Sequence, residues 1–182
     1  MRKNLLFVLA MIFATVAMIS CSSSDKGETG KSGQGSGAYA SAASGQTISF
    51  SAQDLEGKIH TYEEYKGQPL IINFWGTWCP PCKMEMPDIQ KIYDEYNPKG
   101  LEIIGLATER RPEMAVQSVS AFIAQHGYNW VMLIANKESA QSLGLGSGVP
   151  YTLFVDKSGK IVKKHTGMMR YNDFKAEVEK II

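Results

Sequence analysis

Residues 70–82 read LIINFWGTWCPPC, and this segment is the strongest indicator of the fold. Its first six residues (70–75) are almost all apolar, which is typical of a strand buried on both faces of a sheet. A helix is predicted to follow over residues 80–96, because apolar side chains recur there at spacings of three and four. Cys79 and Cys82 therefore lie at the junction between a buried strand and a helix.

The position of Cys79 favours a reactive thiolate. The N-terminus of a helix has unpaired backbone N–H groups and the positive end of the helix dipole, and both stabilise an anion. The first cysteine of a C-x-x-C motif can therefore have a pKa well below the usual value of about 8.5. Cys82, one turn further on, can attack a mixed disulfide formed by Cys79, while Pro80 and Pro81 stiffen the turn between them. The motif predicts thiol–disulfide exchange.

Two other roles for the cysteine pair have less support in the sequence. A structural zinc site usually has four ligands, and the histidines have no paired ligand spacing. These are His60, His126 and His165. A purely structural disulfide would not require a strand-to-helix junction preceded by Trp75 and Trp78. We expect Trp75 to pack in the core and Trp78 to shield Cys79 and offer an apolar docking surface. We also expect no metal, and no cofactor beyond the redox-active cysteines.

The rest of the pattern predicts an α/β domain. Strands are expected at 47–51, 58–62, 101–107, 130–135, 151–156 and 160–164, and helices at 113–125 and from a cap at Asn172 or Asp173 to 182. The alternation of strand, helix and strand implies parallel pairing through right-handed crossovers. Tight-turn signals between the first two strands and between the last two predict antiparallel hairpins. The expected result is a mixed sheet with helices on both faces.

The first 20 residues are typical of a secretory signal sequence. Two basic residues precede an apolar run at 5–19, which is shorter than the roughly 20 residues that a membrane-spanning helix needs. Ser20 and Cys21 resemble the end of a bacterial lipoprotein signal, in which the cysteine is lipidated and becomes the new N-terminus. Cys21 is the expected lipidation site. An ordinary cleaved signal and an uncleaved anchor are the alternatives.

Composition divides the remainder into a tether and one folded domain. Ser, Gly and Ala make up 17 of the 25 residues at 22–46, so we expect a lipidated cysteine and flexible tether over 21–46 and a domain over 47–182. The chain has 19 basic and 18 acidic residues, so its formal charge is +1. This charge is too small to attract the phosphates of a nucleic acid. Nucleic-acid binding is therefore excluded as an expected function, and a monomer is expected.

The segment around the cysteines resembles a known family. Residues 74–82 are similar to the active-site segment of thioredoxins, and WCPPCKMEMP at 78–87 resembles membrane-tethered bacterial thiol–disulfide oxidoreductases of the TlpA/ResA type. The resemblance covers about residues 49–181. It implies a thioredoxin fold with an N-terminal β-hairpin and an inserted helix–strand unit.

The resemblance also implies a substrate site. Val149 and Pro150 resemble the family's cis-proline loop, in which the residue before the proline offers backbone hydrogen bonds to an extended substrate peptide. A trans proline that opens an edge strand is the alternative. Trp78, Pro80 and Pro81 complete the expected substrate-binding residues.

One departure from thioredoxin concerns the proton acceptor. Thioredoxin has a buried aspartate where this sequence has Asn73, which cannot titrate. Glu85, three residues beyond Cys82 on the same helix, is the expected catalytic replacement, and TlpA/ResA-type proteins carry a glutamate at this place. A solvated surface glutamate is the alternative. Glu109, which follows the strand at 101–107, is a second candidate because active sites gather at such strand ends.

The resemblance implies an enzyme of the bacterial cell envelope, exported and held on the membrane by lipidated Cys21. It would reduce disulfides in other envelope proteins, such as apocytochromes c, with electrons from a membrane donor. The alternatives are an oxidase that introduces disulfides, a peroxidase related to the peroxiredoxins, and a copper-binding module that uses Met84 or Met86.

Overall fold

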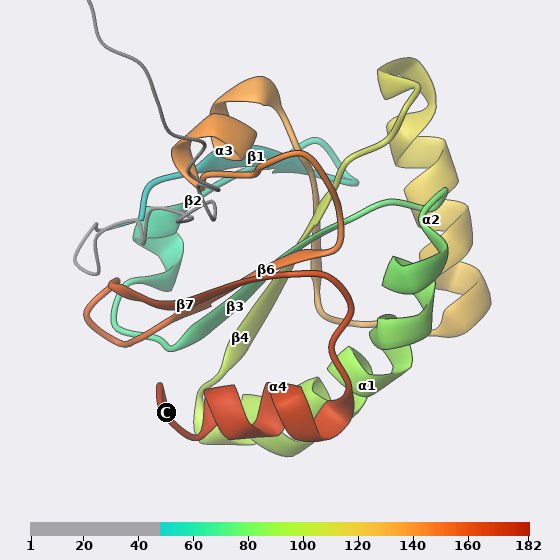
Figure 1. Ribbon diagram of the computed structural model, residues 1–182. Coiled ribbons are helices and arrows are strands. Elements are labelled where there is room, and N and C mark those ends of the chain that lie inside the picture. The colour runs from blue at the N-terminus through green and yellow to red at the C-terminus, as the bar shows by residue number, and fades with distance from the viewer. Residues whose placement is uncertain (1–47) are drawn as a thin grey trace, which may run out of the picture. The chain divides into compact units, whose positions relative to one another are not determined.

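The computed structural model describes residues 48–182, so the predicted signal sequence, Cys21 and the tether lie outside the described residues. A mixed sheet of seven strands runs through the domain in the order β2-β1-β5-β4-β3-β6-β7 (Figure 1). The strands are β1 (Ser51–Asp54), β2 (Ile59–Thr61), β3 (Leu70–Trp75), β4 (Glu102–Ala107), β5 (Val131–Ile134), β6 (Tyr151–Val155) and β7 (Ile161–Thr166). The α-helices are α1 (Pro80–Tyr96), α2 (Ala115–His126), α3 (Lys137–Ser142) and α4 (Tyr171–Val178), with 3₁₀ turns η1 (Tyr62–Tyr65), η2 (Asn97–Lys99) and η3 (Pro112–Met114).

Strand directions follow the sequence pattern. β3, β4 and β5 are parallel neighbours, as the strand–helix–strand alternation predicted. β6 lies antiparallel to β3 and forms a hairpin with β7, while β1 and β2 form a second hairpin that joins the sheet through β5. β5, the strand of the α2–β5 unit, therefore lies between the N-terminal hairpin and β4, which confirms the expected thioredoxin fold with its hairpin and insertion.

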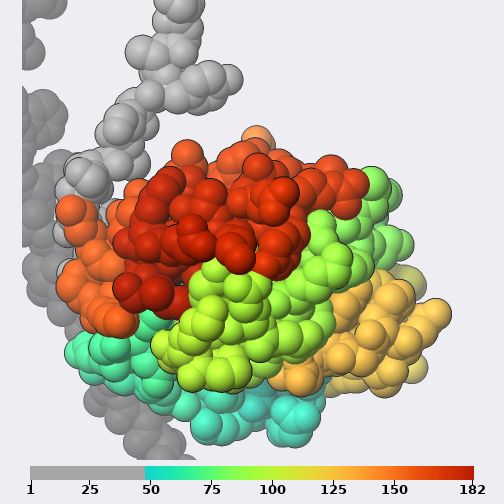
Figure 2. Space-filling view, turned by 90° about the horizontal axis from the view of Figure 1, so that it is seen from below, coloured from blue at the N-terminus to red at the C-terminus, as the bar shows by residue number. Residues whose placement is uncertain are grey.

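Alternation along β3 divides the core into two layers. Ile71 and Trp75 face the cluster formed with α1, α2 and α4, whereas Ile72 and Phe74 face η1 and α3 on the opposite side. Helices thus cover both faces of the sheet, as predicted. Figure 2 shows the C-terminal segment, in red, lying against α1, in yellow-green, on the first of these faces. This packing buries the helix that carries the two cysteines along one side.

The first strand begins later than the sequence predicted. Residues 48, 50 and 52 are alternately buried, as expected of a strand, but the ladder between β1 and β2 starts only at Ser51, which pairs with Thr61. Because η1 begins at Tyr62, no strand residue is available opposite residues 48–50. The backbone N–H of Ile48 instead donates to the Gly159 carbonyl (3.2 Å).

Two helices also differ from expectation. The predicted cap of the last helix is wrong: Arg170 is the N-cap, and Asp173 lies inside the first turn, where its carboxylate accepts the Arg170 backbone N–H (2.9 Å). The sequence pattern did not predict α3, which has only six residues and is started by Asn136, whose side chain accepts the Ser139 N–H (2.7 Å). Within residues 48–182, no helix has the length and apolar character required to cross a membrane.

Candidate active site

The two cysteines lie where the sequence placed them, at the start of α1. They form a disulfide, and Cys79 is the N-cap residue of the helix. The backbone N–H of Cys82 donates to Cys79 Sγ (3.2 Å), so this sulfur takes one of the unpaired donors of the helix N-terminus. The Cys79 residue is 2% exposed and Cys82 is fully buried. The same N–H and the helix dipole would stabilise a Cys79 thiolate after reduction.

The proline loop stands beside Cys79. The peptide bond between Val149 and Pro150 is cis, and the Val149 carbonyl oxygen lies 3.7 Å from Cys79 Sγ. The resemblance predicted this arrangement. The edge-strand alternative is wrong, because β6 follows directly and lies inside the sheet between β3 and β7. A backbone segment from 70 residues further along the chain therefore faces the reactive sulfur.

An exposed rim surrounds the first cysteine. Trp78 is 37% exposed, and its indole N–H donates to the Thr108 carbonyl (2.7 Å), which fixes the ring at the surface. Pro80 and Pro81 are exposed as well. The guanidinium carbon of Arg110 lies 4.2 Å from the centre of the Trp78 ring, in a cation–π contact. The sequence analysis did not include Arg110 among the site residues. The feature of the sequence that could have indicated it is its position, three residues after the end of β4.

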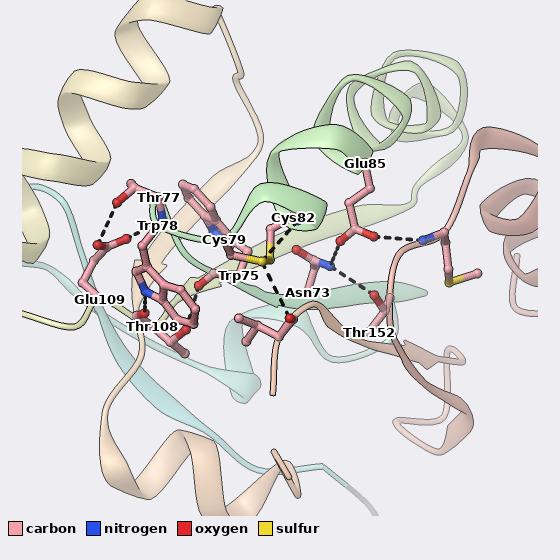
Figure 3. The surroundings of a disulfide bond; sticks show 12 residues. Asn73, Trp75, Thr77, Trp78, Cys79, Cys82, Glu85, Thr108, Glu109 and Thr152 are labelled. Carbon is pink, nitrogen blue, oxygen red and sulfur yellow. Dashed lines mark hydrogen bonds between the residues drawn. A yellow bond between two sulfur atoms is a disulfide. The ribbon is translucent and has the colours of Figure 1, made fainter. Parts of the chain in front are cut away.

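Glu109 holds the loop that precedes Cys79. One carboxylate oxygen accepts the backbone N–H of Thr77 (2.7 Å), and the other accepts the Thr77 hydroxyl (2.8 Å). Both oxygens of Glu109 are thus engaged with a single residue of the loop, as Figure 3 shows. This arrangement gives Glu109 a role in shaping the loop before Cys79.

Glu85 is buried between α1, the sheet and the segment before α4. Its side chain is not solvated, contrary to the alternative left open by the sequence, because the residue is 0% exposed. Oε1 accepts a hydrogen from Asn73 Nδ2 (2.8 Å), and Oε2 accepts the backbone N–H of Met169 (3.0 Å). Burial raises the pKa of Glu85 to about 7, and these two hydrogen bonds offset part of that effect. A carboxyl with this pKa can take up or release a proton near neutral pH.

The remaining parts of the site are Asn73, Thr152 and Trp75. Asn73 Nδ2 also donates to Thr152 Oγ1 (3.1 Å), so its amide links β3 to both α1 and β6. Trp75 is fully buried and packs in the core, as expected. Among residues 48–182, no group of three or more His, Cys, Asp or Glu side chains is arranged to hold a metal ion.

Comparison with known proteins relates this geometry to a family. The sequence profile of the AhpC/TSA family matches residues 44–164. The chain is 36% identical over 124 residues to the thiol-disulfide oxidoreductase ResA of Halalkalibacterium halodurans, which covers 68% of either chain. It is 35% identical over 133 residues to ResA of Geobacillus thermodenitrificans, covering 72% of this chain and 74% of that one. A solved thiol:disulfide interchange protein of the thioredoxin family from Chlorobium tepidum is 26% identical, with a TM-score of 0.68 over 78% of this chain and 99% of its own.

Proposed function

Because this chain belongs to the AhpC/TSA family and is a thiol–disulfide oxidoreductase of the ResA type, we propose that it reduces disulfides in other proteins of the bacterial cell envelope. The observation that supports this most strongly is the Cys79–Cys82 pair at the N-terminus of α1, with Val149 facing the first sulfur. Its substrates would be protein disulfides such as those of apocytochromes c that await haem. The protein would act as a monomer and take electrons from a membrane donor.

The exchange proceeds in two displacements. The Cys79 thiolate attacks one sulfur of the substrate disulfide, and the substrate's other sulfur leaves as a thiolate and takes up a proton. Cys82 then loses its proton and attacks Cys79 Sγ, which breaks the mixed disulfide and releases the second substrate thiol. Two electrons pass to the substrate, and the Cys79–Cys82 disulfide is formed again. Glu85 accepts the proton of Cys82, because it is the buried carboxyl on the same face of α1.

Substrate binding would use both backbone and apolar contacts. An extended peptide segment around the substrate cysteine would form hydrogen bonds with the backbone at Val149, next to Cys79. Trp78, Pro80 and Pro81 would contact its side chains, since all three are exposed around the first cysteine. Such contacts depend little on the substrate's sequence, which suits an enzyme that acts on several proteins.

The reduction potential distinguishes a reductase from an oxidase. We expect the Cys79–Cys82 couple to lie nearer to the roughly −270 mV of thioredoxin than to the roughly −120 mV of DsbA, a strong oxidant. Equilibration of the purified protein with dithiothreitol or glutathione buffers, followed by thiol alkylation and mass spectrometry, measures this value. A potential above about −180 mV, the value for protein disulfide isomerase, would favour the oxidase instead.

The proposed location of the enzyme at a membrane depends on Cys21. We propose that acyl chains on this cysteine hold the domain on the outside of a membrane, each buried CH₂ contributing about 0.8 kcal/mol. Cys21→Ala is expected to release the protein from the membrane fraction of cells. Ser24→Ala is the matched control and should leave the protein in that fraction. If Cys21→Ala stays with the membrane as firmly as the control, lipidation is not what anchors the chain.

A further inference from the structure

Asn73 has one buried hydrogen-bonding atom, Oδ1, that has no role in the exchange mechanism described above. The residue is fully buried on β3, and alternation along the strand places its side chain on the same face as Ile71 and Trp75, toward α1. Both hydrogens of Nδ2 have acceptors, one on Glu85 and one on Thr152. Oδ1 has no partner among residues 48–182. Buried polar atoms without a partner are uncommon and call for an explanation.

The free oxygen is directed toward the cysteines. Figure 3 shows the Asn73 amide between the disulfide and the Glu85 carboxylate, with Oδ1 on the side of the sulfurs. Cys82 and Glu85 are three residues apart on α1 and share a helix face, so the Asn73 amide, which donates to Glu85, lies on the side of α1 that carries Cys82. A disulfide sulfur carries no hydrogen. The oxidised pair therefore offers Oδ1 no donor, although a thiol at the same place would.

We propose that Asn73 Oδ1 accepts a hydrogen bond from the Cys82 thiol when the cysteine pair is reduced. Reduction by a donor dithiol breaks the Cys79–Cys82 bond and forms one disulfide in the donor, and the two electrons and two hydrogens of the donor pass to Cys79 and Cys82. The new S–H group of Cys82 supplies the donor that Oδ1 lacks. The inference rests on the exchange chemistry proposed above but not on its direction.

This hydrogen bond has two consequences for the reaction. An unpaired buried acceptor is unfavourable, and reduction removes that penalty, so Asn73 shifts the equilibrium toward the dithiol. A hydrogen bond donated by the neutral thiol also favours the protonated form of Cys82 over its thiolate. Cys79 has the opposite environment, since a backbone N–H donates to its sulfur. Cys79 is therefore the nucleophile, and Cys82 stays a protonated thiol until it attacks the mixed disulfide.

Asn73→Leu tests the proposal, because leucine has a similar size and no acceptor. At a fixed pH of about 8, where Glu85 is ionised, we expect the equilibrium between dithiol and disulfide to move about tenfold toward the disulfide, which is a potential about 30 mV more negative. Thr152→Val is the matched control, since it removes the other partner of Nδ2 and leaves Oδ1 in place. Its shift should stay below about twofold. Equal shifts in the two variants would overturn the proposal.

A double-mutant cycle distinguishes a direct effect of Asn73 on the Cys82 thiol from an effect that acts through Glu85. Asn73→Leu also removes the hydrogen bond to the Glu85 carboxylate, so the same substitution is made in a Glu85→Gln background. The tenfold shift should persist there if Asn73 acts on the Cys82 thiol. If the shift disappears in that background, Asn73 acts through Glu85 and the proposal is wrong.

Infrared spectroscopy of the reduced wild-type protein tests the hydrogen bond without a variant at Asn73. The S–H stretching band of Cys82, identified by its loss in Cys82→Ser, should lie below the frequency of an unbonded thiol. A band at the unbonded frequency would overturn the proposal even if Asn73→Leu failed to fold. A reduced protein that shows the lowered band but exchanges no protein disulfides would support the hydrogen bond and contradict the proposed function.

Discussion

Cys79→Ser is expected to lower the rate of disulfide exchange by at least about 10³-fold, because the thiolate of this residue is the nucleophile. Its sulfur accepts a helix N-terminal N–H and faces the Val149 carbonyl, whereas Cys82 is fully buried. The rate is measured as reduction of a peptide disulfide by the pre-reduced protein. Serine is close in shape to cysteine, so the variant should keep the fold of the parent.

Cys82→Ser gives the complementary result. It leaves Cys79 able to form a mixed disulfide and removes the thiol that resolves it, so stable adducts with substrate proteins should accumulate in cells. Mass spectrometry of the adducts identifies the substrates, and the double variant Cys79→Ser/Cys82→Ser is the control that should trap nothing. Apocytochromes c among the adducts would support the proposed substrate class. Adducts with Cys79→Ser and none with Cys82→Ser would reverse the assignment of the nucleophile.

Glu85→Gln is expected to slow exchange by about 10²-fold or more, the range in which a positioned acid or base contributes. The pH dependence of the wild-type rate should show a step near pH 7, where burial places the pKa of Glu85. The variant should lack this step because glutamine cannot titrate. Glu109→Gln is the control, since the hydrogen bonds of Glu109 within residues 48–182 go to Thr77. An unchanged rate and pH profile in Glu85→Gln would remove Glu85 from the mechanism.

The same raised pKa predicts a pH dependence of stability. The folded pKa of about 7 lies above the ordinary value of 4.5, so the folded protein binds this proton more tightly than the unfolded chain does. The stabilisation is complete below about pH 4.5 and is lost as the pH rises to 7, with a fall in the free energy of unfolding of roughly 3 kcal/mol. Urea unfolding at pH 5 and pH 8 measures it. Glu85→Gln should lack this fall in the free energy of unfolding between pH 5 and pH 8. An equal fall in the wild-type protein and in the variant would contradict the prediction.

Much of the fold could be predicted from local pattern. The apolar run of β3, the helix after it and the parallel strands were read correctly, because alternation and helical spacing record which side of an element is buried. The errors lie where local pattern is weak. The six residues of α3 are too few to show a period, and the ladder of β1 starts late because η1 limits the length of its partner strand.

The chemistry of this protein can be recognised from one short segment of its sequence. Cys79 and Cys82 are three residues apart at a strand-to-helix junction, so their spacing and the favourable helix N-terminus are local properties of one short segment. The environment of the cysteines, in contrast, arises from tertiary packing. The donors to Glu85 come from Asn73, 12 residues before it, and from Met169, 84 residues after it. Burial, a raised pKa and an unpaired oxygen beside the sulfurs arise when distant segments pack together, and no pattern within one segment records them.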